Sequence, residues 1–164
     1  MSKKKKMRGS VVIMALAISV CLNGSAGACT IGEEAEIELP LNTTALTNAN
    51  RIAIEDAVIE ARNWPDVRIQ AVIMAGAYTV ERNLDRLKED RAKNVMIYLQ
   101  QLGIRSEDIL IEKHTFTDEM VEKRPDGALS YRQVFVEFKP ICNGSCAWMC
   151  NDPRVTPRTK VINP

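Results

Sequence analysis

An arginine lies on the apolar face of a predicted helix, where its charge needs a partner. Between Leu84 and Leu102, apolar side chains recur at spacings of three and four residues, which is typical of one buried helical face. Arg91 interrupts this stripe. A guanidinium buried there alone would cost several kcal/mol. Arg91 must therefore find a partner, extend along the helix to solvent, or line a pocket.

Cysteines are the other residues with chemistry of their own. Of the five, Cys21 falls in an apolar N-terminal run, and Cys29, Cys142, Cys146 and Cys150 remain. Four cysteines in an exported chain predict two disulfides, for which three connectivities are open. The spacing of the last three also fits thiolate ligands of a metal. An oxidising compartment and the lack of a nearby histidine favour disulfides.

The N-terminus has the three parts of a secretory signal: a basic start, the apolar run GSVVIMALAISVCL, and small residues after it. We expect cleavage after the small-x-small sequence at 26–28, which removes residues 1–28. The alternative is a lipoprotein signal, in which Cys29 would be acylated. We favour simple cleavage, because Ala26 stands where an aliphatic residue is preferred and the apolar run ends well before Cys29.

Cleavage makes the protein acidic. Five basic residues leave with the signal, so that Lys+Arg falls from 22 to 17 against 21 Asp+Glu, and the net charge becomes −4. A chain of this charge without a basic run lacks the electrostatic footprint of a nucleic-acid-binding protein. We therefore exclude that class.

The rest of the chain alternates between two hydrophobic periods. These predict the order strand, helix, strand, helix, strand, strand. Strands are expected at 36–41, 67–77, 108–116 and 131–139, and helices at 45–63 and 80–102. The order indicates an α/β two-layer sandwich with both helices on one face of a mixed four-stranded sheet.

The same patterns divide the chain into parts. We expect a signal peptide at 1–28, an N-terminal segment at 29–35, the α/β domain at 36–140 and a cysteine-containing irregular tail at 141–164. Because the tail has several prolines and few apolar residues, we do not expect it to join the core. Trp148 within it either covers the disulfides or forms a surface for a partner.

The second predicted helix carries a recognisable motif. Its pattern L-x-x-x-R-A-x-x-V-x-x-Y-L-x-x-x-G-I falls on Leu87, Arg91, Ala92, Val95, Tyr98, Leu99, Gly103 and Ile104. With the βαβαββ element order, this resembles the OmpA-like domain that binds peptidoglycan, over residues 36–139. The family's Asn-Arg-Arg-Val in the last strand is partly matched by Tyr-Arg-Gln-Val at 131–134. The resemblance implies a non-catalytic module without a cofactor, in the periplasm of a diderm bacterium, where it is free or associated with the outer membrane.

The resemblance also implies how a ligand would be held. In that family an aspartate in a Gly-Tyr-Thr-Asp turn binds the amino group of diaminopimelate, and the helix arginine pairs with its carboxylate. Arg91 matches this arginine, but Val80 replaces the aspartate. Glu81 would supply a carboxylate from the first turn of the helix, or it is an exposed acid of the helix cap.

The ligand-binding residues expected on this basis are Tyr78, Thr79, Glu81, Arg91 and Arg132. Each also has a structural interpretation. Arg91 would serve stability if it paired with Glu81, Asp85 or Asp108, and Arg132 would be a residue of the strand surface.

Two functions follow. The first is binding of peptidoglycan through a diaminopimelate-type stem peptide, at a degenerate site. The alternative is a structural or assembly component of a periplasmic envelope complex that has lost peptidoglycan binding and contacts a protein partner through its tail. An enzyme is not expected, because His114, the only histidine, has no nucleophile paired with it.

This architecture also leads to an expectation about the disulfides. Its first and last strands commonly lie side by side, which would bring Cys29 close to the cysteines after the last strand. Cys29 would then bridge to Cys142, Cys146 or Cys150, and the remaining two would pair locally.

Overall fold

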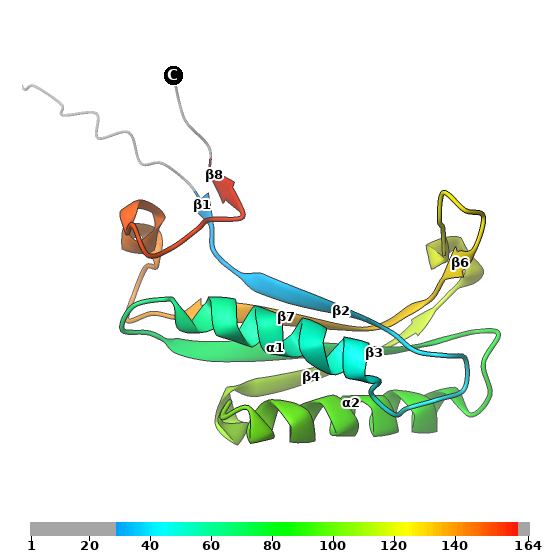
Figure 1. The fold of residues 1–164 in the computed structure, drawn as a ribbon. Coiled ribbons are helices and arrows are strands. Elements are labelled where there is room, and N and C mark those ends of the chain that lie inside the picture. The colour runs from blue at the N-terminus through cyan, green and yellow to red at the C-terminus, as the bar shows by residue number, and fades with distance from the viewer. Residues whose placement is uncertain (1–28, 161–164) are drawn as a thin grey trace, which may run out of the picture.

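A mixed sheet with two helices on one face forms the centre of the protein (Figure 1). The computed structural model describes residues 29–160, so the expected signal peptide and its cleavage site lie outside the described residues. The main elements are β2 (Glu33–Glu38), α1 (Asn48–Arg62), β3 (Arg68–Tyr78), α2 (Leu84–Gln101), β4 (Ile109–Phe116) and β7 (Arg132–Ile141). The predicted fold class is confirmed.

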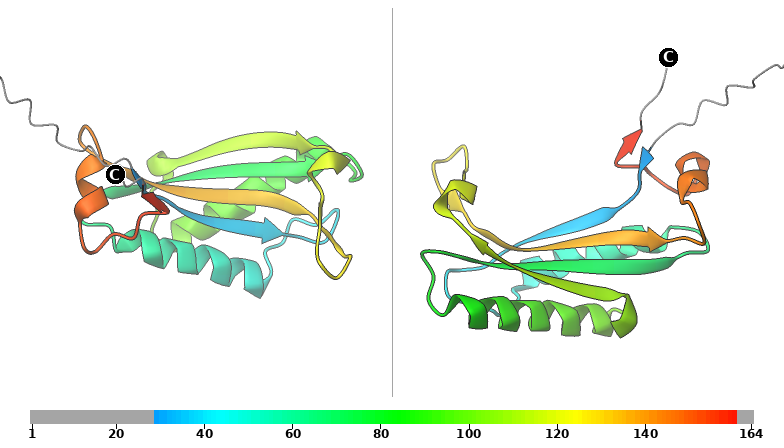
Figure 2. Two further views of the ribbon diagram at one scale, coloured as in Figure 1. Left: turned by 90° about the horizontal axis from the view of Figure 1, so that it is seen from above. Right: turned by 180° about the vertical axis from the view of Figure 1, so that it is seen from behind.

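The sheet has the order β2-β7-β3-β4. β7 is antiparallel to both of its neighbours, while β3 and β4 are parallel and are connected through α2. Both long central strands bury one face against the helices, through side chains such as Ile73 of β3 and Val136 of β7, which lie opposite each other. Figure 2 shows the opposite face uncovered over its middle, with small elements rising at both ends.

Local signals in the sequence fix the start of α1. The hydroxyl of Thr47 accepts from the backbone of Asn50, and the side chain of Asn50 bonds back to Thr47, which forms a capping box. Asn50 also donates to the carbonyl of Glu38 at 3.2 Å. This cap therefore ties the helix to the end of β2.

The first strand lies earlier than its apolar pattern predicts, at 33–38 instead of 36–41. Beyond Glu38 the main chain of Leu39 bonds to a side chain in place of a neighbouring strand. The Gln133 amide donates to the Leu39 carbonyl and accepts from its N–H, both at 2.7 Å. Pro40 then directs the chain away from the sheet.

The disulfide expectation is confirmed. Cys29 is bonded to Cys150, and Cys142 to Cys146. All four of these sulfurs are thereby engaged in bridges in this structure. Short strands β1 (Cys29–Thr30) and β8 (Thr159–Lys160) pair beside the first bridge.

The prediction that the tail stays outside the core is wrong for two of its residues. Met149, in the short helix η3 (Ala147–Asn151), is fully buried, and Val155 is 7% exposed; both belong to the main apolar cluster. The bridge at Cys150 holds this segment against the sheet, so that even a few apolar residues suffice to bury it.

At the opposite end, short elements follow β4. They are η2 (Asp118–Met120) and a hairpin of β5 (Glu122–Lys123) and β6 (Leu129–Ser130). A further short helix, η1 (Ser106–Asp108), lies before β4. Gly127 turns the hairpin with a positive φ of 87°. Among the described residues, no helix has both the length and the apolarity that a membrane crossing requires.

Candidate functional site

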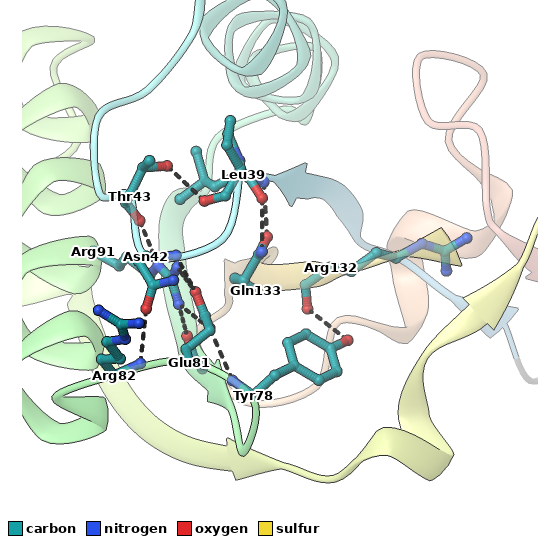
Figure 3. Close-up of polar contacts among 11 residues, drawn as sticks. Leu39, Asn42, Thr43, Tyr78, Glu81, Arg82, Arg91, Arg132 and Gln133 are labelled. Atoms are coloured by element: carbon teal, nitrogen blue, oxygen red, sulfur yellow. Dashed lines mark hydrogen bonds and ion pairs between the residues drawn. The ribbon is translucent and has the colours of Figure 1, made fainter. Parts of the chain in front are cut away.

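Arg91 lies beneath the loop that joins β2 to α1 and is completely buried (Figure 3). Its Nε donates to the carbonyl of Thr43 at 2.9 Å, and Nη1 donates to the carbonyl of Gly76 at 2.8 Å. Both carbonyls belong to other elements, the loop and β3. The arginine that interrupts the apolar stripe is therefore a cross-link between α2, the sheet and this loop.

Glu81 completes the surroundings of the guanidinium. Its carboxylate accepts from both terminal nitrogens of Arg91, with an Oε2–Nη1 distance of 2.9 Å. The same oxygens accept from the backbone N–H groups of Asn42 at 2.8 Å and Tyr78 at 2.9 Å. Neither side chain has any exposed surface. Bidentate geometry and full hydrogen bonding are the conditions under which a buried ion pair is tolerated.

The turn before α2 places Glu81 in this position. The predicted helix start at residue 80 is wrong, since α2 begins at Leu84 and a turn precedes it. Asn83 adopts a left-handed conformation with φ of 53°, which reverses the chain, and the N–H of Glu81 bonds to the carbonyl of Tyr78. Glu81 therefore points inward. The alternative of an exposed cap-region acid is also wrong, while Val80 beside it is 48% exposed.

Asn42 fastens the neighbouring loop to the same turn. It has a left-handed φ of 60°, and its side-chain oxygen accepts from the N–H of Arg82 at 2.7 Å. Pattern reasoning missed this residue. An asparagine two positions after Pro40 was the available signal, because asparagine tolerates left-handed backbone better than other non-glycine residues.

The other acids considered as partners of Arg91 are engaged elsewhere. Asp85 pairs with Lys88 at the surface, and the buried Asp108 pairs with Arg105 at 2.9 Å. Of the three candidates named from sequence, only Glu81 meets Arg91.

The electrostatics of the pair favour the charged form. Burial opposes ionisation of Glu81, but hydrogen bonds from Arg91, Asn42 and Tyr78 outweigh it and hold the pKa of Glu81 below its ordinary value of 4.5. A depressed carboxyl pKa contributes stability that is present above the unfolded pKa and is lost as pH falls through the folded pKa.

We therefore expect acid to weaken the fold partly through Glu81. The urea midpoint of the wild type should fall more between about pH 7 and about pH 3 than that of Glu81→Gln, in which position 81 no longer titrates. Equal falls in the two proteins, measured by circular dichroism, would assign the acid sensitivity to other groups.

The remaining predicted residues lie on the other side of the sheet end. The Tyr78 hydroxyl donates to the carbonyl of Arg132 at 3.4 Å. Arg132 forms ion pairs with Glu36 and Glu122. Thr79 lies in the intervening turn, where its hydroxyl is 3.4 Å from Asp118. The structure thus joins Glu81 to Arg91 and Tyr78 to Arg132, in two separate groups linked through the backbone of Tyr78.

The second group borders a cavity of about 300 Å³ under the β5–β6 hairpin. Its walls are Tyr78, Phe116, Glu119, Met120, Glu122, Ser130, Arg132 and Phe135. The Tyr78 ring meets those of Phe116 and Tyr131 at centroid distances of 5.2 and 5.1 Å. Burial raises the pKa of Tyr78. The phenol therefore stays neutral and serves as a wall and hydrogen-bond donor.

Gly76 is a further residue of this region that pattern reasoning missed. A Cβ at this position would lie 2.0 Å from Cε2 of Phe116, so the glycine lets the ring lie flat on β3. The same residue offers its carbonyl to Arg91. Gly76 thus links the two groups of the site.

Gly76→Ala is expected to push the Phe116 ring away and to cost about 1–3 kcal/mol in the free energy of unfolding. Urea titration measures the loss, and near-UV circular dichroism reports the displaced aromatic cluster. Gly144→Ala is the comparison for displacement, because a Cβ there meets no atom within 4 Å. Its positive φ of 85° makes the change costly in stability, but it should leave the near-UV signal of the aromatic cluster unaltered.

No protein-family model matches the chain, and no curated protein matches it by sequence. Several solved structures resemble it, two bacterial domains among them. The C-terminal domain of Helicobacter pylori MotB is 17% identical, covers 68% of this chain and 87% of that one, and superposes with a TM-score of 0.47. The OmpA-like domain of FopA1 from Francisella tularensis is 14% identical, covers 83% and 100%, and has a TM-score of 0.44. Neither likeness bears on a ligand.

Two further residues named from sequence lie away from the site. His114 is half-exposed on β4, and its Nε2 is 3.5 Å from Glu112. Trp148 is 47% exposed on η3.

Proposed function

We propose that the protein is a non-catalytic, exported component of the cell envelope, in which an OmpA-like fold serves as a structural or assembly module. The observation that carries this proposal is the buried pair of Glu81 and Arg91. By the family resemblance, Arg91 would receive the carboxylate of a diaminopimelate-type stem peptide. Here the carboxylate of Glu81 already fills that face of the guanidinium.

Exchange of Glu81 for a ligand carboxylate offers no evident gain. An incoming carboxylate would replace one bidentate pair with another of the same kind. The displaced Glu81 would also lose its bonds to the N–H groups of Asn42 and Tyr78, which would remain unpaired inside the protein. Binding of a stem peptide at Arg91 in place of Glu81 is therefore unfavourable.

The two disulfides support the proposed compartment, because such bonds persist in oxidising surroundings such as the periplasm. On this proposal a protein partner, in the periplasm or at the outer membrane, contacts the disulfide-bonded tail. The half-exposed Trp148 is its most prominent apolar side chain.

Peptidoglycan binding is the second candidate. The observation that favours it is the position of Arg91 beneath the loop between β2 and α1, to which its Nε donates through the carbonyl of Thr43 (Figure 3). Tyr78 and Arg132 border a separate cavity under the β5–β6 hairpin. Binding would require the loop to open and Glu81 to leave.

A sedimentation assay with isolated sacculi separates the two candidates. The exported, disulfide-bonded protein is expected to stay in the supernatant, as does a non-binding control, while a peptidoglycan-binding OmpA-like domain sediments. Co-sedimentation of the wild type that is competed by free stem peptide would overturn the assembly proposal and establish the second candidate. In parallel, chemical cross-linking in cells should capture one specific protein with the wild type and lose it with Trp148→Ala.

A further inference from the structure

The strand β4 forms one edge of the sheet, and its outer side is unpaired within residues 29–160. It pairs with β3 alone, in continuous register from Ile109 to Phe116. Six of its eight residues are exposed. Figure 2 (left) shows β4 along one rim of the sheet and β2 along the other. A long, regular edge presents free N–H and C=O groups to which another strand can add.

The opposite edge is protected in a way that β4 is not. β2 carries Glu33, Glu34, Glu36 and Glu38, and its register with β7 is irregular at its end. Charges and irregularities of this kind prevent edge pairing. β4 has neither a proline nor a register shift. Its one lysine, Lys113, is held by Glu89 of α2.

One hydrogen bond shows which backbone groups of β4 point away from β3. The carbonyl of Phe116 accepts from Thr79 and so points toward the β3 side. Backbone direction alternates along a strand that is paired on one side, so the N–H and C=O groups of Ile111, Lys113 and Thr115 point outward. The edge thus offers six backbone groups at alternate residues.

Side chains alternate in the same way. Lys113 and Thr115 meet Glu89 and Lys88 of α2, which places them on the helix side. Leu110, Glu112, His114 and Phe116 therefore share the open face. Among them Leu110 is 48% exposed and Glu112 lies beside His114. This face of the edge carries the exposed Leu110 at one end and the neighbouring Glu112 and His114 at its centre, while Phe116 at the other end is only 7% exposed.

We infer that β4 pairs antiparallel with β4 of a second copy of this chain, about a two-fold axis at Lys113. In this register Glu112 faces His114 of the second copy, twice by symmetry, in the pairs whose side chains lie closest. Leu110 faces the position of Phe116, whose ring is 7% exposed and packs over Gly76 of its own β3, so that this pair contributes little to the contact. Lys113 faces its own copy, and each ammonium is already bonded to Glu89.

Neighbouring registers that keep the same faces together are less favourable. An axis at Glu112 places two glutamates opposite each other, and an axis at His114 places Glu112 against the apolar side chain of Phe116. An axis at Ile111 places Leu110 against the charge of Glu112. Glutamates opposite each other or opposite an apolar side chain are unfavourable, whereas the two lysines that meet at the axis through Lys113 are each neutralised by Glu89 of their own copy. The pattern of β4 therefore selects the axis at Lys113.

The expected dimer is concentration-dependent. Six backbone hydrogen bonds and two small side-chain groups make an interface below the standard size of stable complexes. Association of two subunits extends the sheet from four strands to eight and leaves the Glu81–Arg91 site untouched. The inference is therefore independent of the proposed function.

Single cysteines along the edge test the register. Lys113→Cys should form an intermolecular disulfide most readily, because hydrogen-bonded antiparallel partners have Cα atoms about 5.5 Å apart, within the range of about 4.4–6.8 Å that a disulfide spans. Ile111→Cys, Glu112→Cys and His114→Cys are the matched controls, since all four positions are exposed. The full chain is exported, purified and compared on non-reducing gels. Strongest cross-linking at a control position, or none at Lys113→Cys, would overturn the inference.

His114→Glu provides a test without added cysteines. It places a glutamate opposite Glu112 in each of the two symmetric pairs. We expect the dissociation constant of the dimer, measured by analytical ultracentrifugation, to rise by about tenfold or more. Asn143→Glu also introduces one glutamate, but on the tail, and it should leave the dissociation constant of the dimer unchanged. A wild type that stays monomeric at every concentration, or equal effects of the two variants, would contradict the pairing.

Discussion

Glu81→Ala is expected to lower the free energy of unfolding by about 3–5 kcal/mol, because it leaves the guanidinium of Arg91 buried without its counter-ion. The remaining acceptors of Arg91 are the carbonyls of Thr43 and Gly76, which carry no full charge. Urea titration measures the loss. Such a loss is a large part of the total stability of an ordinary domain.

The matched controls separate this buried pair from surface ion pairs. Arg91→Ala should cost a similar amount, and the double variant Glu81→Ala/Arg91→Ala should lose clearly less than the sum of the two single changes. Asp90→Ala breaks the exposed pair with Arg86 and should cost about 0.5 kcal/mol or less. Additive losses at 81 and 91 would mean that the two side chains do not stabilise each other.

The second large effect concerns the bridge from Cys29 to Cys150. Replacement of both cysteines by alanine is expected to cost about 3–5 kcal/mol, because the bridge joins residues 121 positions apart and restricts the unfolded chain accordingly. It should also release Met149 and Val155 from the core. Urea titration of the variant and of the oxidised wild type measures the difference.

The other disulfide is the internal control for this prediction. The pair of Cys142 and Cys146 closes a segment of only four residues' separation, so its removal should cost about 2 kcal/mol or less. If the two double variants were equally destabilised, the loss would reflect local packing around the sulfurs and not the length of the closed loop.

The sequence predicted the layers of the fold because each element carries its own periodicity. The four long strands and both helices lie within a few residues of their expected positions. Their ends differ where a side chain takes over a backbone contact. Gln133 replaces a strand neighbour for Leu39, and no periodicity reveals this, because the two residues are far apart in sequence.

The contact between Glu81 and Arg91 was among the pairings considered from sequence, but the arrangement of the site was not predictable. Arg91 was recognisable because a charge on an apolar stripe requires a partner, and Glu81 was among the acids within reach. The left-handed turn at Asn83 decides that Glu81 points inward, and the loop through Asn42 decides that the pair is closed. Both depend on contacts between segments distant in sequence.

The structure of the tail was also predictable only in part. Its composition indicates an irregular segment, which describes its backbone between 142 and 158 apart from the short helix η3. Composition does not reveal that a covalent bond holds Met149 against the sheet. Cross-linking overrides a weak apolar pattern, because the entropy of ordering the segment is reduced by the bridge.

The guanidinium of Arg91 is paired with the carboxylate of Glu81 and is not available to a ligand. Side-chain nitrogen–proton NMR spectra test this most directly, through the Nε–H signal of Arg91 during titration with a diaminopimelate-containing muropeptide. We predict a signal protected from exchange with water and unshifted at every ligand concentration. A saturable shift of this signal, accompanied by faster exchange, would contradict the account and return Arg91 to the role of a ligand-binding residue.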